Sequence, residues 1–244
     1  SFKTIALILV ILLIALVIFE IVQFVWRVYV GKKIAAESQK FSIKNLNPTK
    51  KILFIGDSTA VGTGANDPKE SVAGRFSQKF PNADITNLGK NGARTREIVE
   101  LIYNIKESYD LIVLQIGGND ILRFTDLQIL ENDIDKVLSQ ATKISNKVIL
   151  LTAGNVGLAP IFPFPLSLFY TNQTLKVRKI FMKVAKINNV IYVDLYTERK
   201  DDVFLTDPKR YYSGDMLHLS GEGYGVWFDK IIKATKNAGY FLGF

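Results

Sequence analysis

The fold is decided by the stretch Lys51-Ile52-Leu53-Phe54-Ile55-Gly56-Asp57-Ser58. Its first five residues predict a buried strand, and Gly56 permits a sharp turn that a residue with a Cβ would resist. Ser58 follows the end of that strand, where open α/β sheets bind their ligands. The position suits a nucleophile, because its hydroxyl is held at a rigid rim near backbone N–H groups. Gly-Asp-Ser is also common turn chemistry, so this stretch alone leaves both interpretations open.

Strands and helices alternate along the rest of the chain. Further strands are predicted over 83–87, 110–116, 147–152 and 190–195. The run 110–116 is the clearest, because its unbroken apolar sequence predicts burial on both faces, as in a parallel sheet. Helices are predicted over 67–80, 95–106, 126–145, 171–187 and 220–237. The alternation predicts an α/β fold with a five-stranded, doubly wound parallel sheet and helices on both faces.

The composition of the chain excludes several kinds of catalytic and metal-binding site. It has no cysteine, which excludes disulfides, thiolate zinc sites and cysteine nucleophiles. Its one histidine, His218, excludes a zinc site built on several histidines, although not a magnesium or calcium ion held by carboxylates. The net charge is +8, and residues 1–50 carry seven Lys or Arg against two Asp or Glu. The basic character therefore belongs largely to the N-terminal segment and indicates a membrane surface as partner, not a nucleic acid.

Residues 4–30 predict a membrane-spanning helix. No charge occurs from Thr4 to Phe19, and the stretch from Ile5 to Trp26 would measure about 33 Å as a helix, enough to cross a bilayer core of about 30 Å. A cleavable signal peptide is the alternative, but its apolar core would be shorter and no small-residue cleavage site follows. We therefore expect an anchor over 1–30, a basic juxtamembrane linker over 31–50 and one folded domain over 51–244.

The loops at the predicted strand ends each offer a chemical group. Ser58 offers a hydroxyl, Gly89 an unhindered backbone N–H, and Asn119 a side-chain amide. Asp215 and His218 are three residues apart, so a single turn could bring a carboxylate and an imidazole together.

These residues resemble the SGNH, or GDSL-type, hydrolase family. Its sequence blocks read here, in order, Gly56-Asp57-Ser58-Thr59, Asn87-Leu88-Gly89, Gly117-Gly118-Asn119-Asp120 and Asp215-Met216-Leu217-His218. The match covers about residues 51–237 and is closest to the small lysophospholipase and thioesterase-like branch. Thr59 replaces the leucine of the family's name, at a position that does not carry the chemistry. The resemblance implies a flavodoxin-like three-layer α/β/α fold and no cofactor.

The resemblance also implies a role for each site residue. Ser58 would be the nucleophile, His218 the base and Asp215 the residue that orients the histidine. The N–H of Ser58, the N–H of Gly89 and the amide of Asn119 would form the oxyanion hole. We expect a membrane-anchored serine esterase acting on acyl esters, with lipid-like or lysophospholipid substrates. The alternatives are deacetylation of a cell-envelope glycan by the same site, and a membrane scaffold that keeps the fold without catalysis.

The segment Leu158–Tyr170 is too apolar for an ordinary surface loop, and its prolines argue against regular structure in its first half. It could line an acyl groove, touch the bilayer or cap the core. For the first case we name Phe162, Phe164 and Leu166 as substrate-binding candidates.

The side of the membrane is predicted from basic residues. Only Lys3 precedes the span, whereas Arg27, Lys32 and Lys33 follow it, which places the domain on the cytoplasmic face. Membrane-anchored members of the resembled family often face outward, so the extracytoplasmic side is the alternative. Because every candidate site residue follows Lys51, we also expect the domain to stay active without residues 1–30.

Overall fold

The protein is described by a computed structural model that covers residues 2–237, 239 and 240. Its strands form one sheet in the order β2-β1-β3-β4-β5, and every neighbouring pair is parallel. The strands are β1 (Lys50–Gly56), β2 (Ala83–Asn87), β3 (Leu111–Gln115), β4 (Val148–Leu151) and β5 (Ile191–Val193). The predicted five-stranded, doubly wound parallel sheet is confirmed. The strand order reverses between β1 and β3, and such a switch point is where open α/β sheets bind ligands.

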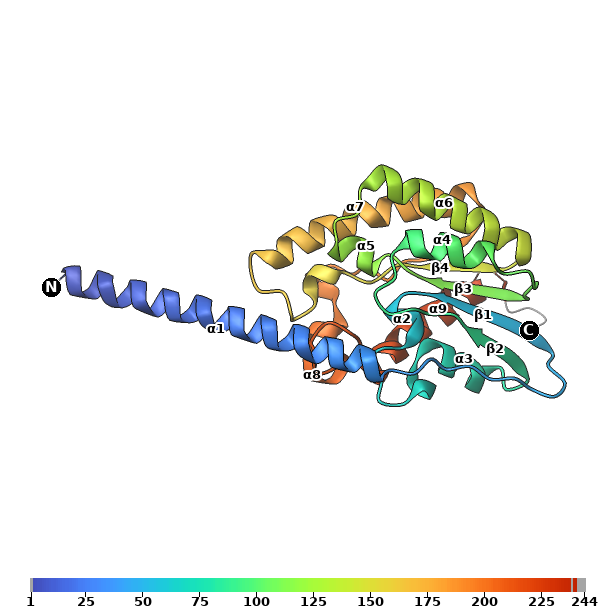
Figure 1. Cartoon of the computed structure of the whole chain (residues 1–244), viewed down its shortest axis with the longest axis horizontal. Coiled ribbons are helices and arrows are strands. Elements are labelled where there is room, and N and C mark those ends of the chain that lie inside the picture. The colour runs from blue at the N-terminus through green and yellow to red at the C-terminus, as the bar shows by residue number, and fades with distance from the viewer. Residues whose placement is uncertain (1, 238, 241–244) are drawn as a thin grey trace.

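Helices cover both faces of the sheet and give it the predicted three layers. One layer holds α4 (Thr95–Tyr103), α6 (Leu127–Ile144) and α7 (Leu166–Ile187), which pack side by side (Figure 1). The other holds α3 (Val72–Lys79) and α9 (Gly221–Asn237). Short helices α2 (Ser58–Val61), α5 (Gly118–Leu122) and α8 (Pro208–Tyr211) belong to the loops. Single 3₁₀ turns span 68–70, 156–158, 199–201 and 203–205.

The core sits on the two central strands. Ile52 to Ile55 of β1 and Leu111 to Leu114 of β3 are completely buried, as expected for strands covered on both faces. The ring of Phe54 packs edge-to-face on Phe76 of α3, with the ring centroids 5.2 Å apart. The carboxyl ends of both strands are buried, so the loops that follow them start from rigid positions.

Two helix boundaries differ from the predicted ones for local reasons. The helix expected over 67–80 is divided, because the Asp67 side chain caps a 3₁₀ turn and the Ser71 side chain caps α3 separately. The helix expected from Thr171 begins at Leu166, directly after Pro165. A proline is tolerated at a helix start, since the first N–H groups have no partner within the helix.

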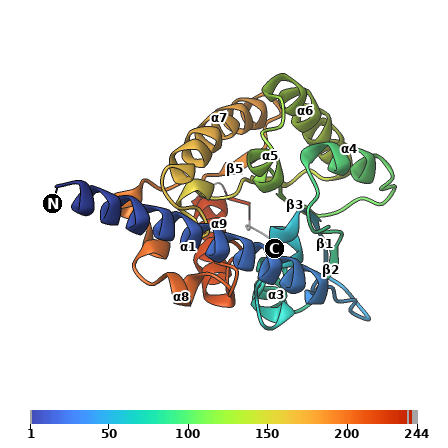
Figure 2. The same ribbon diagram turned by 60° about the vertical axis from the view of Figure 1, so that its left-hand side comes forward.

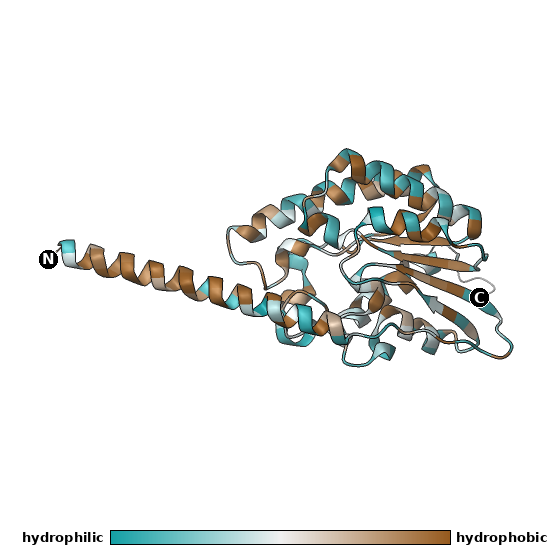
Figure 3. Cartoon of the chain, in the orientation of Figure 1, coloured by the Kyte–Doolittle hydropathy of each residue, from teal (hydrophilic) through white to brown (hydrophobic). Residues whose placement is uncertain are grey.

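The N-terminal helix α1 (Phe2–Glu37) projects far from the sheet (Figures 1 and 2). Its outer part is strongly apolar, and it becomes more polar where it reaches the domain (Figure 3). By length and composition α1 fits a membrane anchor or a signal sequence. It does not end near Val30. It continues to Glu37 through the first part of the expected linker, and Ile43 then forms an isolated bridge with Ile85 of β2.

Gly56 is the glycine on which the turn after β1 depends, and its replacement is the first test of the fold. A Cβ at Gly56 would lie 1.9 Å from the carbonyl oxygen of Gln115, a backbone atom of the neighbouring strand. Gly56→Ala should therefore lower the free energy of unfolding by about 3 kcal/mol or more. Thermal denaturation measures this.

Gly225→Ala in α9 is the control, because its Cβ would meet only the flexible end of Arg75 at 3.1 Å. It should be neutral or stabilising by up to about 1 kcal/mol. Equal melting temperatures for wild type and Gly56→Ala would contradict this account.

Candidate active site

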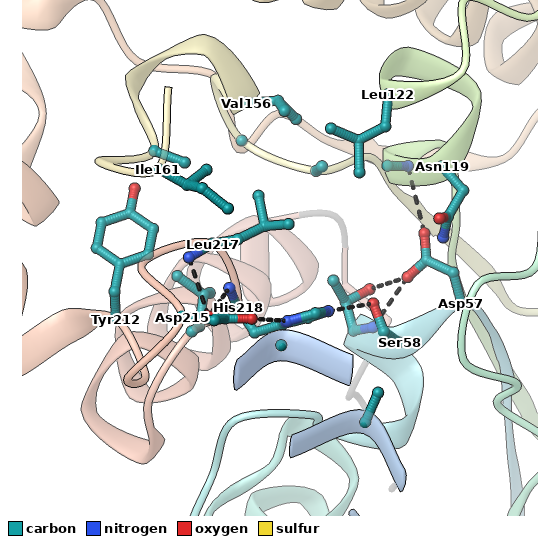
Figure 4. A pocket seen from close by; sticks show the side chains of 18 of the residues that line it. Asp57, Ser58, Asn119, Leu122, Val156, Ile161, Tyr212, Asp215, Leu217 and His218 are labelled. Atoms are coloured by element: carbon teal, nitrogen blue, oxygen red, sulfur yellow. Dashed lines mark hydrogen bonds and ion pairs between the residues drawn. The ribbon is translucent and has the colours of Figure 1, made fainter. Parts of the chain in front are cut away.

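The structure brings Ser58, His218 and Asp215 together at the carboxyl edge of the sheet (Figure 4). The Nε2 atom of His218 lies 3.2 Å from Ser58 Oγ, and its Nδ1 atom lies 2.5 Å from Asp215 Oδ2. Ser58 is the first residue of α2 and is 8% exposed. The geometry is that of a nucleophile, a base and an orienting acid connected in series.

The Asp215 carboxylate is held by the turn that follows it. Its Oδ1 atom accepts hydrogen bonds from the Ser213 hydroxyl at 2.7 Å and from the N–H groups of Leu217 and His218 at 3.0 Å each. Met216 makes this turn possible by adopting a left-handed conformation with φ 59°. Burial alone would raise the pKa of Asp215, but the hydrogen bonds and charge of His218, with those of Leu217 and Ser213, hold it below its usual range. The ionised carboxylate accepts a hydrogen bond from the Nδ1–H group, which leaves Nε2 of His218 as the acceptor for the Ser58 hydroxyl.

Asp57 and Asp120 brace the loops around the serine. The Oδ1 atom of Asp57 accepts hydrogen bonds from the N–H and hydroxyl of Thr59, and Oδ2 accepts one from the Gly118 N–H at 3.2 Å. Complete burial raises the pKa of Asp57 to about 6, against the lowering effect of those hydrogen bonds. Asp120 accepts from the N–H and hydroxyl of Thr95. The loops after β1, β2 and β3 are therefore tied to one another by carboxylates.

Two of the three predicted oxyanion-hole residues line the cavity. Ser58 and Asn119 line the same cavity, and no described residue bonds the Ser58 N–H or the Asn119 side-chain amide. The third, Gly89, does not line the cavity. Its N–H donates to Asn87 Oδ1 at 2.9 Å, and it lies against the backbone of Ala60 and Val61 instead of the cavity.

Gly92, in the same loop, lies at the cavity although the sequence did not single it out. It lines the cavity, has φ +75°, and its N–H donates to no described residue. A signal for it was present in the sequence, because an Asn side chain commonly bonds the backbone N–H two residues further on. Asn87 therefore occupies the N–H of Gly89 and leaves the next glycine of the loop for the site.

A cavity of about 320 Å³ opens beside Ser58 and His218. Its wall is mostly apolar and includes Leu122, Val156, Ile161, Leu195, Phe204, Leu217 and Trp227, several of which are labelled in Figure 4. Among residues 2–237, 239 and 240, no group of three or more Asp, Glu and His side chains is placed to hold a metal ion.

The three substrate-binding candidates do not line this cavity. Phe162 is buried and packs on Tyr170, with ring centroids 4.2 Å apart, whereas Phe164 and Leu166 are exposed. Their segment still contributes to the wall, but through Ala159 and Ile161. The composition of the segment could not reveal which of its apolar side chains reach the cavity.

The cavity has one further wall that the sequence reasoning did not predict. It is formed by α1 residues Arg27, Val28, Gly31, Lys32 and Ala35. The spacing Gly31 to Ala35 places two small residues on one helix face, a pattern that permits close approach of another element.

Comparisons with known proteins agree with this geometry. The sequence model of the GDSL-like lipase/acylhydrolase family matches residues 54–226, whereas no curated protein matched the chain. A lipolytic protein of the G-D-S-L family from Veillonella parvula is 20% identical, with a TM-score of 0.59 over 75% of this chain and 96% of its own.

Two further solved structures share the fold. LAE5, an α/β hydrolase from the metagenome of Lake Arreo, is 18% identical, with a TM-score of 0.58 over 78% of this chain and 97% of its own. Axe2, an acetylxylan esterase from Geobacillus stearothermophilus, is 19% identical, with a TM-score of 0.57 over 78% and 96%. The family match covers most of the chain and contains Ser58, Asn119, Asp215 and His218. The chain therefore belongs to the GDSL-like lipase/acylhydrolase family, and it is a carboxylic ester hydrolase.

Proposed function

We propose that this protein is a membrane-attached serine esterase that hydrolyses acyl esters of lipid-like molecules through an acyl-enzyme on Ser58. The observation that carries the proposal is the position of Ser58 Oγ, 3.2 Å from His218 Nε2 and at the edge of an apolar cavity. A nucleophile beside an apolar wall is suited to an ester whose acyl chain is itself apolar.

The reaction has two steps. In the first, Ser58 Oγ attacks the ester carbonyl carbon while His218 Nε2 takes the hydroxyl proton, and the histidine then gives that proton to the departing alcohol oxygen. In the second, water attacks the carbonyl carbon of the acyl-enzyme and gives a proton to His218 Nε2. The bond from Ser58 Oγ to the acyl group then breaks, and the histidine returns the proton to Oγ. Asp215 stays ionised throughout and stabilises the imidazolium that forms in each step.

The negative charge that develops on the carbonyl oxygen needs donors that are already in place. The Ser58 N–H, the Gly92 N–H and the Asn119 amide supply them in this proposal, and no described residue competes for them. Donors held in fixed positions cost no reorganisation when the charge develops, which is why they lower the barrier.

The cavity wall favours a lipid-like substrate over a glycan. Each methylene that an acyl chain buries is worth about 0.8 kcal/mol, less the cost of ordering the chain. An acetylated glycan would instead need polar groups for its sugar hydroxyls, and most of the surface that lines the cavity is apolar. Glycan deacetylation remains the second candidate, and the substrate experiment below separates the two.

Two apolar features support attachment to a bilayer. One is α1, whose residues from Ile5 to Tyr29 are largely exposed. The other is the segment around the first turn of α7, here called the tip, in which Phe164, Leu168 and Phe169 are exposed. The tip lies on the side of the domain from which α1 projects (Figure 1), and Arg27 Nη1 donates to the Pro160 carbonyl at 2.5 Å. A membrane around the outer part of α1 would therefore meet the tip as well.

Acyl-chain length is the property that tests the proposed substrate class. The full chain in lipid nanodiscs should hydrolyse octanoyl esters with a kcat/KM at least about 10-fold above that for acetyl esters of the same alcohol. Ser58→Ala and His218→Ala should abolish both activities, because Ser58 Oγ is the described hydroxyl that bonds His218 Nε2 and the chain has no other histidine. A preference for acetyl esters would favour the glycan deacetylase instead. Turnover that survives in Ser58→Ala would contradict the proposed nucleophile.

Asn119 provides the test of the oxyanion hole. Asn119→Ala removes a donor that should act mainly in the transition state, so kcat should fall by about 10²–10³ with little change in KM. Asn146→Ala is the matched control, because Asn146 is exposed in the loop at the opposite edge of the sheet. Steady-state kinetics on a short soluble ester measures both. A loss confined to KM would mean that Asn119 binds the substrate without stabilising the charge.

A further inference from the structure

The inner end of α1 is seated on the domain through specific contacts. Arg27 donates to the Pro160 carbonyl, and the Asn91 side chain donates to the Ala35 carbonyl at 2.7 Å. Between them, a Cβ at Gly214 would lie 3.7 Å from Val30 Cγ1. These partners belong to three loops at the carboxyl edge of the sheet. The helix is therefore docked across the site and does not merely lead to it.

One face of this segment forms a wall of the active-site cavity. Val28, Gly31, Lys32 and Ala35 line it, at the spacing of one helix face. Gly31 is the one buried residue of α1. In Figure 4 the blue ribbon of α1 passes close below the labelled His218 and Ser58.

Gly31 approaches Asp215 so closely that a side chain at position 31 would have no room. A Cβ at position 31 would lie 2.7 Å from Asp215 Oδ2, and 3.4 Å from its Cβ. Oδ2 is the oxygen that bonds His218 Nδ1 at 2.5 Å. The Asp215 side chain is 1% exposed, so α1 helps to keep water from that bond. Exclusion of water strengthens a charge-assisted hydrogen bond.

We propose that Gly31 is a positioning residue, which lets the backbone of α1 seat against Asp215 and fix the oxygen that orients His218. The inference rests on the proposed function, since it needs the Ser58–His218–Asp215 arrangement to be catalytic. It replaces the expectation that the domain keeps its activity without residues 1–30, because such a chain loses part of the seated helix. The family match starts at residue 54, so this contribution comes from outside the matched domain.

The test places the same side chain on two faces of the same helix. Gly31→Leu places a Cβ 2.7 Å from Asp215 Oδ2, whereas Ala36→Leu adds the same side chain at an exposed position. In the full chain in nanodiscs, Gly31→Leu should slow labelling by a fluorophosphonate probe by about 10²-fold, and kcat for a short ester should fall equally at constant KM. Ala36→Leu should match wild type.

A second background shows whether the effect passes through Asp215. In Asp215→Asn the orienting carboxylate is already lost, so adding Gly31→Leu should change the labelling rate by less than about threefold. A structural role alone would instead give the same loss in both backgrounds. That outcome would overturn the proposal.

Gly31→Ala, the smaller substitution, is the control for misfolding of Gly31→Leu. Leucine and alanine are both better helix formers than glycine, so neither Gly31→Leu nor Gly31→Ala should weaken α1 itself. If Gly31→Leu does not fold, Gly31→Ala carries the test, and a folded Gly31→Ala with wild-type kinetics overturns the inference. Failure of the proposed function is distinguishable, because wild type itself would then not react with the probe.

Discussion

The bond between Asp215 Oδ2 and His218 Nδ1 is the interaction on which the rest of the site depends. It fixes which nitrogen of the only histidine faces Ser58, and the second carboxylate oxygen is fully occupied by Ser213, Leu217 and His218. The other buried acids near the site act differently. Burial raises the pKa of Asp57 and Asp120, which accept hydrogen bonds from loop backbone, whereas the pKa of Asp215 is lowered because its partner is an imidazole. Environment thus separates one acid that serves the chemistry from two that hold the loops.

Much of the fold could be predicted from local patterns. The central strands β1 and β3 were recognisable because they are buried on both faces and so carry unbroken apolar runs. The triad was predictable for a different reason. Asp215 lies three residues before the only histidine, and the four sequence blocks that resemble the SGNH hydrolases implied a role for Ser58, Asp215 and His218. Both signals are short local patterns, which a sequence displays directly.

The remaining parts of the site depend on how segments meet in space. Gly89 and Gly92 differ in function only because the Asn87 side chain takes the N–H of one of them. Phe162 and Phe164 are the same type of residue and lie two positions apart, yet one is buried and the other is exposed. Gly31 lies 184 residues before Asp215, and nothing in the apolar pattern of α1 shows that its inner end crosses the site. A hydropathy pattern reports what a helix is made of, but not what its last turns contact.

The identity of the nucleophile is the central claim, and intact-protein mass spectrometry tests it most directly. The full chain in nanodiscs is treated with a fluorophosphonate, its mass is measured, and the modified peptide is sequenced. The account predicts one adduct per chain, located on Ser58, with complete loss of ester hydrolysis. Hydrolysis that continues after full modification of Ser58, or an inactivating adduct on another residue, would contradict it.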